Sequence, residues 1–153
     1  MALTADEVRA RYIREHPRHE FDFRGCTDGV DVIDAYDNSL TATAMNGATC
    51  SNQGLVFDGS DGYVDVTPWP FGGGAMTVEA YVKWDVLGSY SRIFDFFDTT
   101  DTRDDNVIFS ESNEGGLYWS VAVGSTADSL ASSSILEAGV WAHVVTTVEG
   151  TTF

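Results

Sequence analysis

One stretch of this chain, residues 54–84, constrains the fold more than any other because apolar and polar side chains alternate between turn-forming residues. Two short alternating runs, Gly54–Phe57 and Tyr63–Val66, flank the sequence Asp58-Gly-Ser-Asp-Gly62, and a longer run covers Met76–Trp84. A period of two places successive side chains on opposite faces of a strand. Since Gly and Asp supply the turns between the runs, the stretch predicts an antiparallel β meander.

The same alternation continues along the rest of the chain from His19 onward, with separators rich in Gly, Asp, Asn and Ser. Ten short strands without an intervening helix predict an all-β fold, an antiparallel two-sheet sandwich or jelly roll. The predicted strands are Glu20–Arg24, Val30–Tyr36, Leu40–Ala44, Gly54–Phe57, Tyr63–Thr67, Met76–Trp84, Ser91–Phe97, Asn106–Glu111, Gly116–Val123 and Trp141–Glu149.

The first 18 residues follow a different pattern. Thr4 and Glu7 have the spacing of a capping box, and apolar residues then recur at helical spacing with arginines between them. Pro17 ends the pattern, because the residue before a proline avoids the helical region. We therefore expect one short amphipathic helix over Leu3–His16.

Negative charge dominates the composition. The 153 residues carry a net charge of −16, and residues 1–24 contribute none of it because five acidic groups balance five arginines there. Such a field repels nucleic acids and anionic membrane surfaces, so neither is an expected partner. No apolar run reaches the length of a membrane-spanning helix, and the N-terminus has no basic-then-apolar order of a secretory signal.

The two cysteines, Cys26 and Cys50, are 24 residues apart, and turn-forming residues surround each of them. An even count in a β-rich chain favours a disulfide that closes one loop, which indicates an oxidising compartment. Two unpaired thiols in a cytosolic protein are the alternative.

Four motifs, in this order and spacing, resemble laminin-G-like jelly rolls of the concanavalin A-like lectin/glucanase superfamily. They are Gly54-Leu-Val-Phe-Asp-Gly-Ser-Asp-Gly-Tyr-Val-Asp-Val66, Met76-Thr-Val-Glu-Ala-Tyr-Val-Lys83, Arg92-Ile-Phe-Asp-Phe96 and Trp141-Ala-His-Val-Val-Thr146. The resemblance covers about Phe21 to the C-terminus. It implies two curved sheets with a concave face, and a domain that binds glycans or proteins outside the cell, often with bound calcium.

The resemblance also implies a division of the chain. Residues 1–18 resemble the closing segment of such a domain, and residues 19–153 resemble a jelly roll that continues beyond Phe153 in other members. We expect a chain that covers the end of one repeat and most of the next, in a parent protein with tandem repeats. A truncated gene product is the alternative. Because an incomplete sandwich exposes strand edges, poor solubility in isolation is expected.

Catalysis is not expected. Laminarinase-type glucanases of this fold carry Glu-x-Asp-x-x-Glu on one strand, where one glutamate is the nucleophile and the other the acid/base. Here Glu20 and Asp22 are present, but Gly25 occupies the second glutamate position. The resemblance therefore implies a non-catalytic lectin-like or adhesive module of the cell exterior or surface. An accessory or degenerate domain of a glycan-processing enzyme, with its catalytic part elsewhere, is the alternative.

An acidic loop is the candidate metal site. Calcium takes six to eight oxygen ligands, and oxygen-bearing side chains concentrate between residues 95 and 106. The spacing matches no EF-hand, and a solvated acidic loop is the alternative. The candidate calcium ligands are Asp95, Asp98, Asp101, Asp104, Asp105 and Asn106.

If the domain binds glycans, aromatic side chains are the expected contact residues, because sugars place their apolar faces against aromatic rings. On Met76–Trp84 one face carries Thr, Glu, Tyr and Lys, so Glu79, Tyr81 and Lys83 are the candidate ligand-binding residues. Trp141–Glu149 is similar, with His143 expected to hydrogen-bond within the sheet. The aromatic residues considered are Trp69, Tyr81, Trp84, Tyr90, Tyr118 and Trp119. Ser112–Trp119 has Asp-box spacing, but its two glycines favour a hairpin.

Overall fold

The structure is a computed structural model of the chain, and it describes residues 19–69, 76–88, 91–97, 106–112, 115–123 and 126–148, without the side chains of residues 97, 123 and 148. These residues form eleven strands, and every strand pair among them is antiparallel. The predicted all-β antiparallel class is therefore confirmed. The helix predicted over Leu3–His16 lies outside the described residues. The chain divides into two compact units, Met1–Phe71 and Gly72–Phe153.

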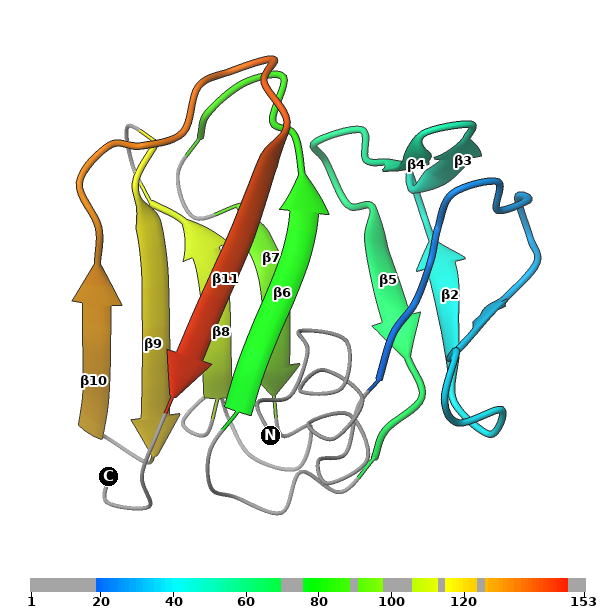
Figure 1. Cartoon of the computed structure of the whole chain (residues 1–153), viewed down its shortest axis with the longest axis horizontal. Coiled ribbons are helices and arrows are strands. Elements are labelled where there is room, and N and C mark those ends of the chain that lie inside the picture. Colours follow the sequence, from blue (N-terminus) through cyan, green and yellow to red (C-terminus); the bar gives the residue numbers. More distant parts are fainter. Residues whose placement is uncertain are drawn as a thin grey trace, which may run out of the picture. The chain divides into compact units, whose positions relative to one another are not determined.

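The first unit contains a three-stranded sheet and a small hairpin (Figure 1). Strand β2 (Thr41–Met45) lies at the centre of the sheet, between β1 (Val32–Ile33) and β5 (Tyr63–Val66). Strands β3 (Thr49–Ser51) and β4 (Gly54–Val56) pair only with each other among the described strands. Alternation along β2 and β5 buries small and β-branched side chains on one face of the sheet, as a period of two requires.

A buried carboxylate organises the loop after β1. Asp34 is 1% exposed, and its side chain accepts hydrogen bonds from the backbone N–H of Tyr36 at 2.6 Å and of Asp37 at 2.9 Å. His19 Nδ1 lies 2.9 Å from Asp34 Oδ2 and so ties the segment before β1 to this loop. Because these bonds turn the backbone at Asp34, the strand predicted over Val30–Tyr36 shortens to β1.

The predicted meander is wrong in its pairing, although its strands exist. Strand β4 pairs with β3 across the two-residue loop of Asn52 and Gln53, and β5 pairs with β2. A two-residue connection is the most favourable hairpin loop, so β3 outcompetes β5 as the partner of β4. The segment 58–62 instead forms a loop closed by Asp58, whose Oδ1 accepts from the Ser60 N–H at 2.9 Å. A Cβ atom at Gly47 would overlap the Asp58 carboxylate, so a larger residue there would displace that carboxylate from its position.

One further strand prediction fails, and two strands were not predicted. Residues 20–24 form no strand, because Asp22 accepts hydrogen bonds from the backbone and side chain of Arg24 and the chain turns there. Strands β3 and β10 (Thr126–Ala131) were not predicted. All six residues of β10 are exposed. Since neither face is buried, its sequence need not alternate apolar and polar residues, and the pattern that predicts a strand is absent.

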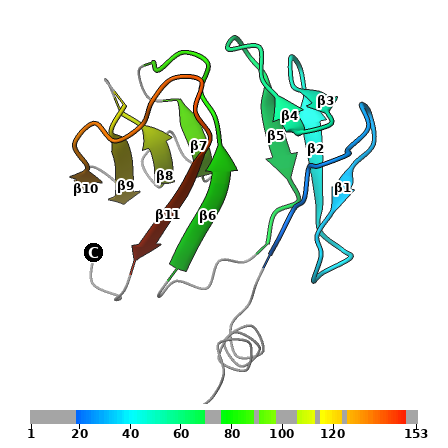
Figure 2. The ribbon, with the colours of Figure 1, turned by 45° about the horizontal axis from the view of Figure 1, so that its top comes forward.

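The second unit has two layers (Figures 1 and 2). Strands β6 and β11 form one layer, and the other is a four-stranded sheet in the order β10-β9-β8-β7. The remaining strand bounds are β6 Met76–Val82, β7 Arg92–Phe97, β8 Asn106–Glu111, β9 Leu117–Val123 and β11 Ala142–Val148.

The core of this unit lies between its two layers. Phe109 on β8 and Trp119 on β9 are directly paired across the sheet, with ring centroids 6.1 Å apart, and Val144 of β11 packs with them. Apolar side chains of β6, including Val78 and Ala80, cover the same cluster. Removing a buried ring such as Phe109 costs about 3–5 kcal/mol, so this contact makes a large contribution to the stability of the unit.

The hairpin predicted at Ser112–Trp119 is confirmed. Glu111 pairs with Leu117 in register, and Gly115 in the intervening turn has a φ of +83°. A Cβ at Gly115 would lie 2.8 Å from the Leu136 carbonyl oxygen, so the position requires glycine for its space as well as its φ. The fully buried Glu111 side chain accepts from the Gly115 N–H at 3.0 Å and holds this turn.

Candidate functional site

The outward side of β6 and β11 carries an aligned set of aromatic and polar side chains. Period two sends Met76, Val78, Ala80 and Val82 toward the core, and their neighbours on β6 outward. On the β11 side, residues 141–147 alternate in the same way, with the odd-numbered residues exposed. The resulting surface, here called the β6–β11 outer face, consists of Thr77, Glu79, Tyr81, Lys83, Trp141, His143, Val145 and Thr147.

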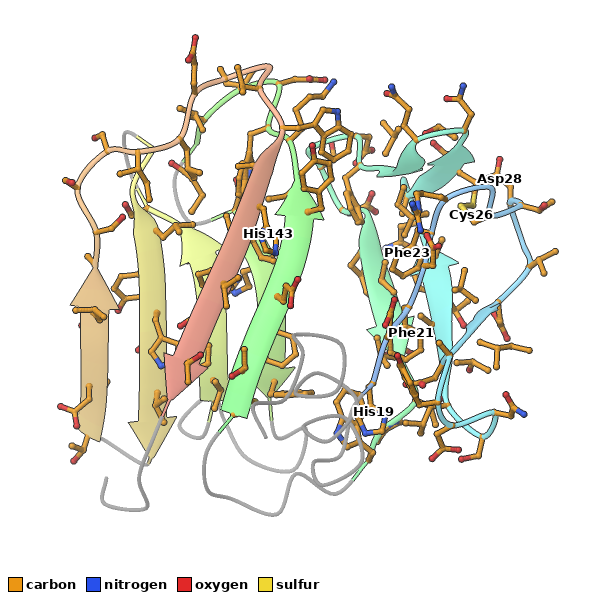
Figure 3. All side chains as sticks on the ribbon, in the orientation of Figure 1. His19, Phe21, Phe23, Cys26, Asp28 and His143 are labelled. Carbon is orange, nitrogen blue, oxygen red and sulfur yellow. A yellow bond between two sulfur atoms is a disulfide. The ribbon has the colours of Figure 1, made fainter. Side chains whose placement is uncertain are left out.

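Side chains from the two sides of this face meet in pairs. The rings of Tyr81 and Trp141 are parallel within 2°, with centroids 4.9 Å apart. His143 Nε2 lies 2.8 Å from Glu79 Oε1. Figure 3 shows His143 on β11 beside β6. At the other end, the hydroxyls of Thr77 and Thr147 are hydrogen-bonded at 3.0 Å.

Register explains these contacts. Tyr81 is directly opposite His143, and Glu79 is directly opposite Val145. The observed Glu79–His143 contact is therefore diagonal, and Tyr81 likewise reaches past His143 to Trp141. Diagonal neighbours in an antiparallel pair are about 7–8 Å apart, which is within reach of aromatic and long side chains.

Exposure separates the two stacked rings. Tyr81 is 66% exposed, whereas Trp141 is 36% exposed because Tyr81 stacks on it and the Lys83 ammonium lies 5.8 Å from its ring centroid. A ligand can therefore reach more of Tyr81 than of Trp141. Trp141 supports the tyrosine ring and holds its orientation.

These contacts contribute little to stability. The Glu79–His143 contact is exposed, and exposed polar pairs of this kind contribute about 0–1 kcal/mol, while cross-strand pairs contribute about 0.2–1 kcal/mol each. Lys83 is also paired, since its Nζ lies 3.4 Å from Asp85 Oδ1. An ordered, exposed array of rings, a carboxylate and hydroxyls offers both stacking and hydrogen bonds to a ligand.

The structure thus brings the predicted residues Glu79, Tyr81 and Lys83 onto one face and adds two residues that were not predicted as ligands. Trp141 and His143 occupy this face because β11 is the partner of β6, and a single sequence does not specify that pairing. The sequence signal was present in part, since both residues fall on one side of an alternating strand.

Only part of the predicted calcium site can be placed. Asp95 on β7 and Asn106 on β8 are described, and the other four candidates lie in the range 98–105, outside the described residues. Asp95 pairs with Ile108 and Asn106 with Phe97, so both side chains are on the same face of the hairpin. Asp95 Oδ2 lies 2.8 Å from Arg92 Nε. Within the described ranges, no three His, Cys, Asp or Glu residues gather closely enough to hold a metal ion.

The acidic pair near the start of the chain has a local role. The pKa of Asp22 is lowered to about 2, first by the hydrogen bond from the Arg24 side chain and second by the bond from the Arg24 backbone N–H. Glu20 and Asp22 lie on irregular chain, so they do not share a strand face as a glucanase pair would.

Other predicted residues have structural positions. Cys26 and Cys50 form the predicted disulfide, with Cα atoms 5.6 Å apart. Figure 3 shows Cys26 and the nearby Asp28, whose side chain accepts a hydrogen bond from the Cys50 N–H. Trp119 is in the core, and Trp69 lies against His19 with ring centroids 4.8 Å apart.

The second unit is a two-layer β-sandwich, and comparison with known proteins identifies the family. A laminin-G family model, described as the concanavalin A-like lectin/glucanases superfamily, matches residues 58–153. The match covers more than half of the chain and includes every strand from β5 to β11, so this chain belongs to that superfamily.

Among solved structures, this chain is similar to an S-layer domain-containing protein (residues 221–444) from Clostridium thermocellum, with 21% identity and a TM-score of 0.59. The similarity covers 82% of this chain and 61% of that one, so this chain spans less than two thirds of the solved domain. At this identity the similarity shows the fold alone. No curated protein matches the sequence. Within the described part of the chain, no helix is both long and apolar enough to cross a membrane.

Proposed function

We propose that this chain is a non-catalytic recognition module, lectin-like or adhesive, that binds glycans or proteins through the β6–β11 outer face. The observation that carries the proposal is the exposed Tyr81 ring held parallel to Trp141, beside the Glu79–His143 pair. An aromatic face with polar groups at its edge is suited to a sugar ring, which has an apolar face and hydroxyls around its rim. Membership of a superfamily that includes lectins supports this reading.

The first test removes the exposed ring. We expect Tyr81→Ala to lower glycan affinity by about 1–2 kcal/mol, because it deletes the stacking surface and leaves the core intact. Binding on a glycan array, with and without EDTA, is the measurement. Tyr63→Ala is the matched control, because Tyr63 is also a strand tyrosine, 48% exposed, and lies on β5.

Two results separate binding from structure. If Tyr81→Ala lowers the free energy of unfolding by as much as it lowers the free energy of glycan binding, the stack is a structural pair and the proposed site is wrong. If neither variant changes the binding of a glycan that the native chain recognises, another surface is responsible.

Calcium is a proposed cofactor, with ligands from the segment 95–106. Carboxylate and amide oxygens suit calcium, and Asp95 and Asn106 lie on one face of the β7–β8 hairpin. Because Asp95 is also bound to Arg92, calcium has to compete with that guanidinium. We expect CaCl₂ to raise the melting temperature above that in NaCl of equal ionic strength. Equal melting temperatures in the two salts would rule out the site.

The second candidate is an accessory or degenerate domain of a glycan-processing enzyme. The glucanase members of the superfamily support it, whereas the irregular backbone at Glu20 and Asp22 argues against catalysis by this chain itself. A polysaccharide-depolymerisation assay on the chain tests this directly, and product release would overturn the non-catalytic assignment.

We also propose that the protein works outside the cell or at its surface. The Cys26–Cys50 disulfide supports this, because such bonds persist in oxidising compartments. The similar solved structure belongs to an S-layer domain-containing protein, which supports a surface location. Fractionation of the source cells, followed by non-reducing mass spectrometry, tests both the location and the bond.

A further inference from the structure

Basic side chains in the second unit are few, and those that the structure describes have acidic partners. Residues 72–153 contain twelve acidic groups and three basic ones, Lys83, Arg92 and Arg103. Lys83 is paired with Asp85 at 3.4 Å and Arg92 with Asp95 at 2.8 Å. His143, the one histidine of this unit, lies against Glu79. Among the described residues, no basic group on the β6–β11 outer face lacks an acidic neighbour.

A ligand that approaches this face therefore meets a negative potential. Glu79 is at the centre of the face with its side chain 66% exposed, and an ionised carboxylate can only accept hydrogen bonds. Sugar hydroxyls can donate to it, whereas a sulfate or carboxylate would be repelled. The net charge of −16 adds a long-range contribution of the same sign.

We infer that the β6–β11 outer face selects glycans without negative charge, with Tyr81 as the stacking residue and Glu79 as the residue that rejects anionic sugars. This inference rests on the proposed function and specifies its ligand class. Lys83 does not attract anionic glycans to this face, because its ammonium is paired with Asp85 and lies over the Trp141 ring. Thr77 and Thr147 add neutral hydroxyls at the other end of the face.

The test uses the full chain on an array printed with neutral, amino, sialylated, sulfated and uronic-acid glycans. The best neutral and the best anionic ligands are then titrated by calorimetry at low and physiological salt. We expect the neutral glycan to bind at least about tenfold more tightly, with an affinity that salt hardly changes. Tyr81→Ala should weaken that binding about tenfold, and Tyr63→Ala should not.

Two charge variants test the discrimination itself. Glu79→Gln keeps the size of the side chain and removes its charge, so the preference for neutral over anionic glycans should shrink by about tenfold. Asp85→Asn removes the acidic partner of Lys83 and should raise anionic affinity without changing neutral affinity. Circular dichroism melts establish that both variants remain folded.

The outcomes distinguish this inference from the proposed function. Anionic glycans that bind the native chain more tightly than neutral ones, and lose binding in Tyr81→Ala, would overturn the inference and leave the recognition function intact. A native chain that binds no glycan on the array would overturn the inference and leave only the protein-binding form of the proposed function. An unchanged preference in Glu79→Gln would remove the role assigned to Glu79.

Discussion

At the scale of single residues, a few aspartate side chains fix the loops of the first unit by accepting hydrogen bonds from nearby backbone N–H groups. Asp58 is one of these. It closes the loop after β4 through the Ser60 N–H, and its carboxylate lies so close to Gly47 that a side chain there would displace it. The hydrogen bond from Ser60 is the main cause that lowers the pKa of Asp58, and the backbone N–H of Gly62 acts in the same direction.

This lowered pKa predicts a pH dependence. A carboxyl whose folded pKa is below its unfolded value stabilises the fold above about pH 4, and this contribution is lost as pH falls through the folded pKa. Asp58→Asn removes the titrating group, so the variant should lose stability relative to the native chain at neutral pH, and the difference should shrink in acid. Urea unfolding at several pH values measures it.

Asp61→Asn is the companion variant, because it removes one charge from the same loop and so allows the effect of net charge to be subtracted. A difference between native chain and Asp58→Asn that stays constant down to pH 2 would show that the Asp58 carboxylate does not act through the Ser60 bond.

At the scale of elements, short-range connections decide which strands pair in the first unit. Strands β3 and β4 form a hairpin of their own, and the disulfide ties β3 to the loop before β1 through Cys26. Because few large side chains are buried among the described residues of this unit, covalent and polar links replace core packing there. The His19–Asp34 contact is a second link of this kind.

Removing the disulfide should therefore destabilise the first unit. In the chain-entropy model a loop of this length contributes about 3 kcal/mol, so Cys26→Ser with Cys50→Ser should lower the unfolding free energy by about that amount. Denaturant unfolding, compared with the native chain under oxidising conditions, measures the change. Hydrogen exchange at the amides of β8 and β9 supplies the internal reference, because these strands hold the core of the second unit. Equal stability with and without the bond would contradict the prediction.

At the scale of the whole molecule, charge is the dominant property. The excess of sixteen negative charges lies outside the first 24 residues, so the β-rich part carries all of it. Self-repulsion of this size keeps a protein soluble but opposes compaction. The expectation of poor solubility from exposed strand edges remains a prediction, and repulsion between copies acts against it.

Screening this repulsion should stabilise the fold. Raising NaCl from about 10 mM to about 150 mM shortens the screening length from about 30 Å to about 8 Å, so the melting temperature should rise by a few degrees. Differential scanning calorimetry measures the shift, and KCl in place of NaCl should give the same curve. A melting temperature that falls with salt would show that attractive ion pairs, such as Arg92–Asp95, outweigh the repulsion.

Much of the fold was predictable because a strand with one buried face alternates apolar and polar side chains along its sequence. The alternation in Met76–Trp84 and Trp141–Glu149 predicted the exposed face of each strand, and the structure confirms both faces. Strand β10 was missed because neither of its faces is buried, and Glu20–Arg24 was overpredicted because the Asp22–Arg24 contact turns the chain there.

The sequence by itself determined the all-β antiparallel class, the outward position of Tyr81 and Glu79 and the strongly negative charge, and it favoured a Cys26–Cys50 disulfide. These properties depend on local periodicity and composition, which a single chain displays directly. Only the tertiary structure decided that β4 pairs with β3, and that β11 lies beside β6 in the register that stacks Trp141 on Tyr81 and sets His143 against Glu79. Several distant segments of this chain have similar alternation, so alternation alone does not specify which strands pair. The candidate site forms only when β11 pairs with β6 in the observed register.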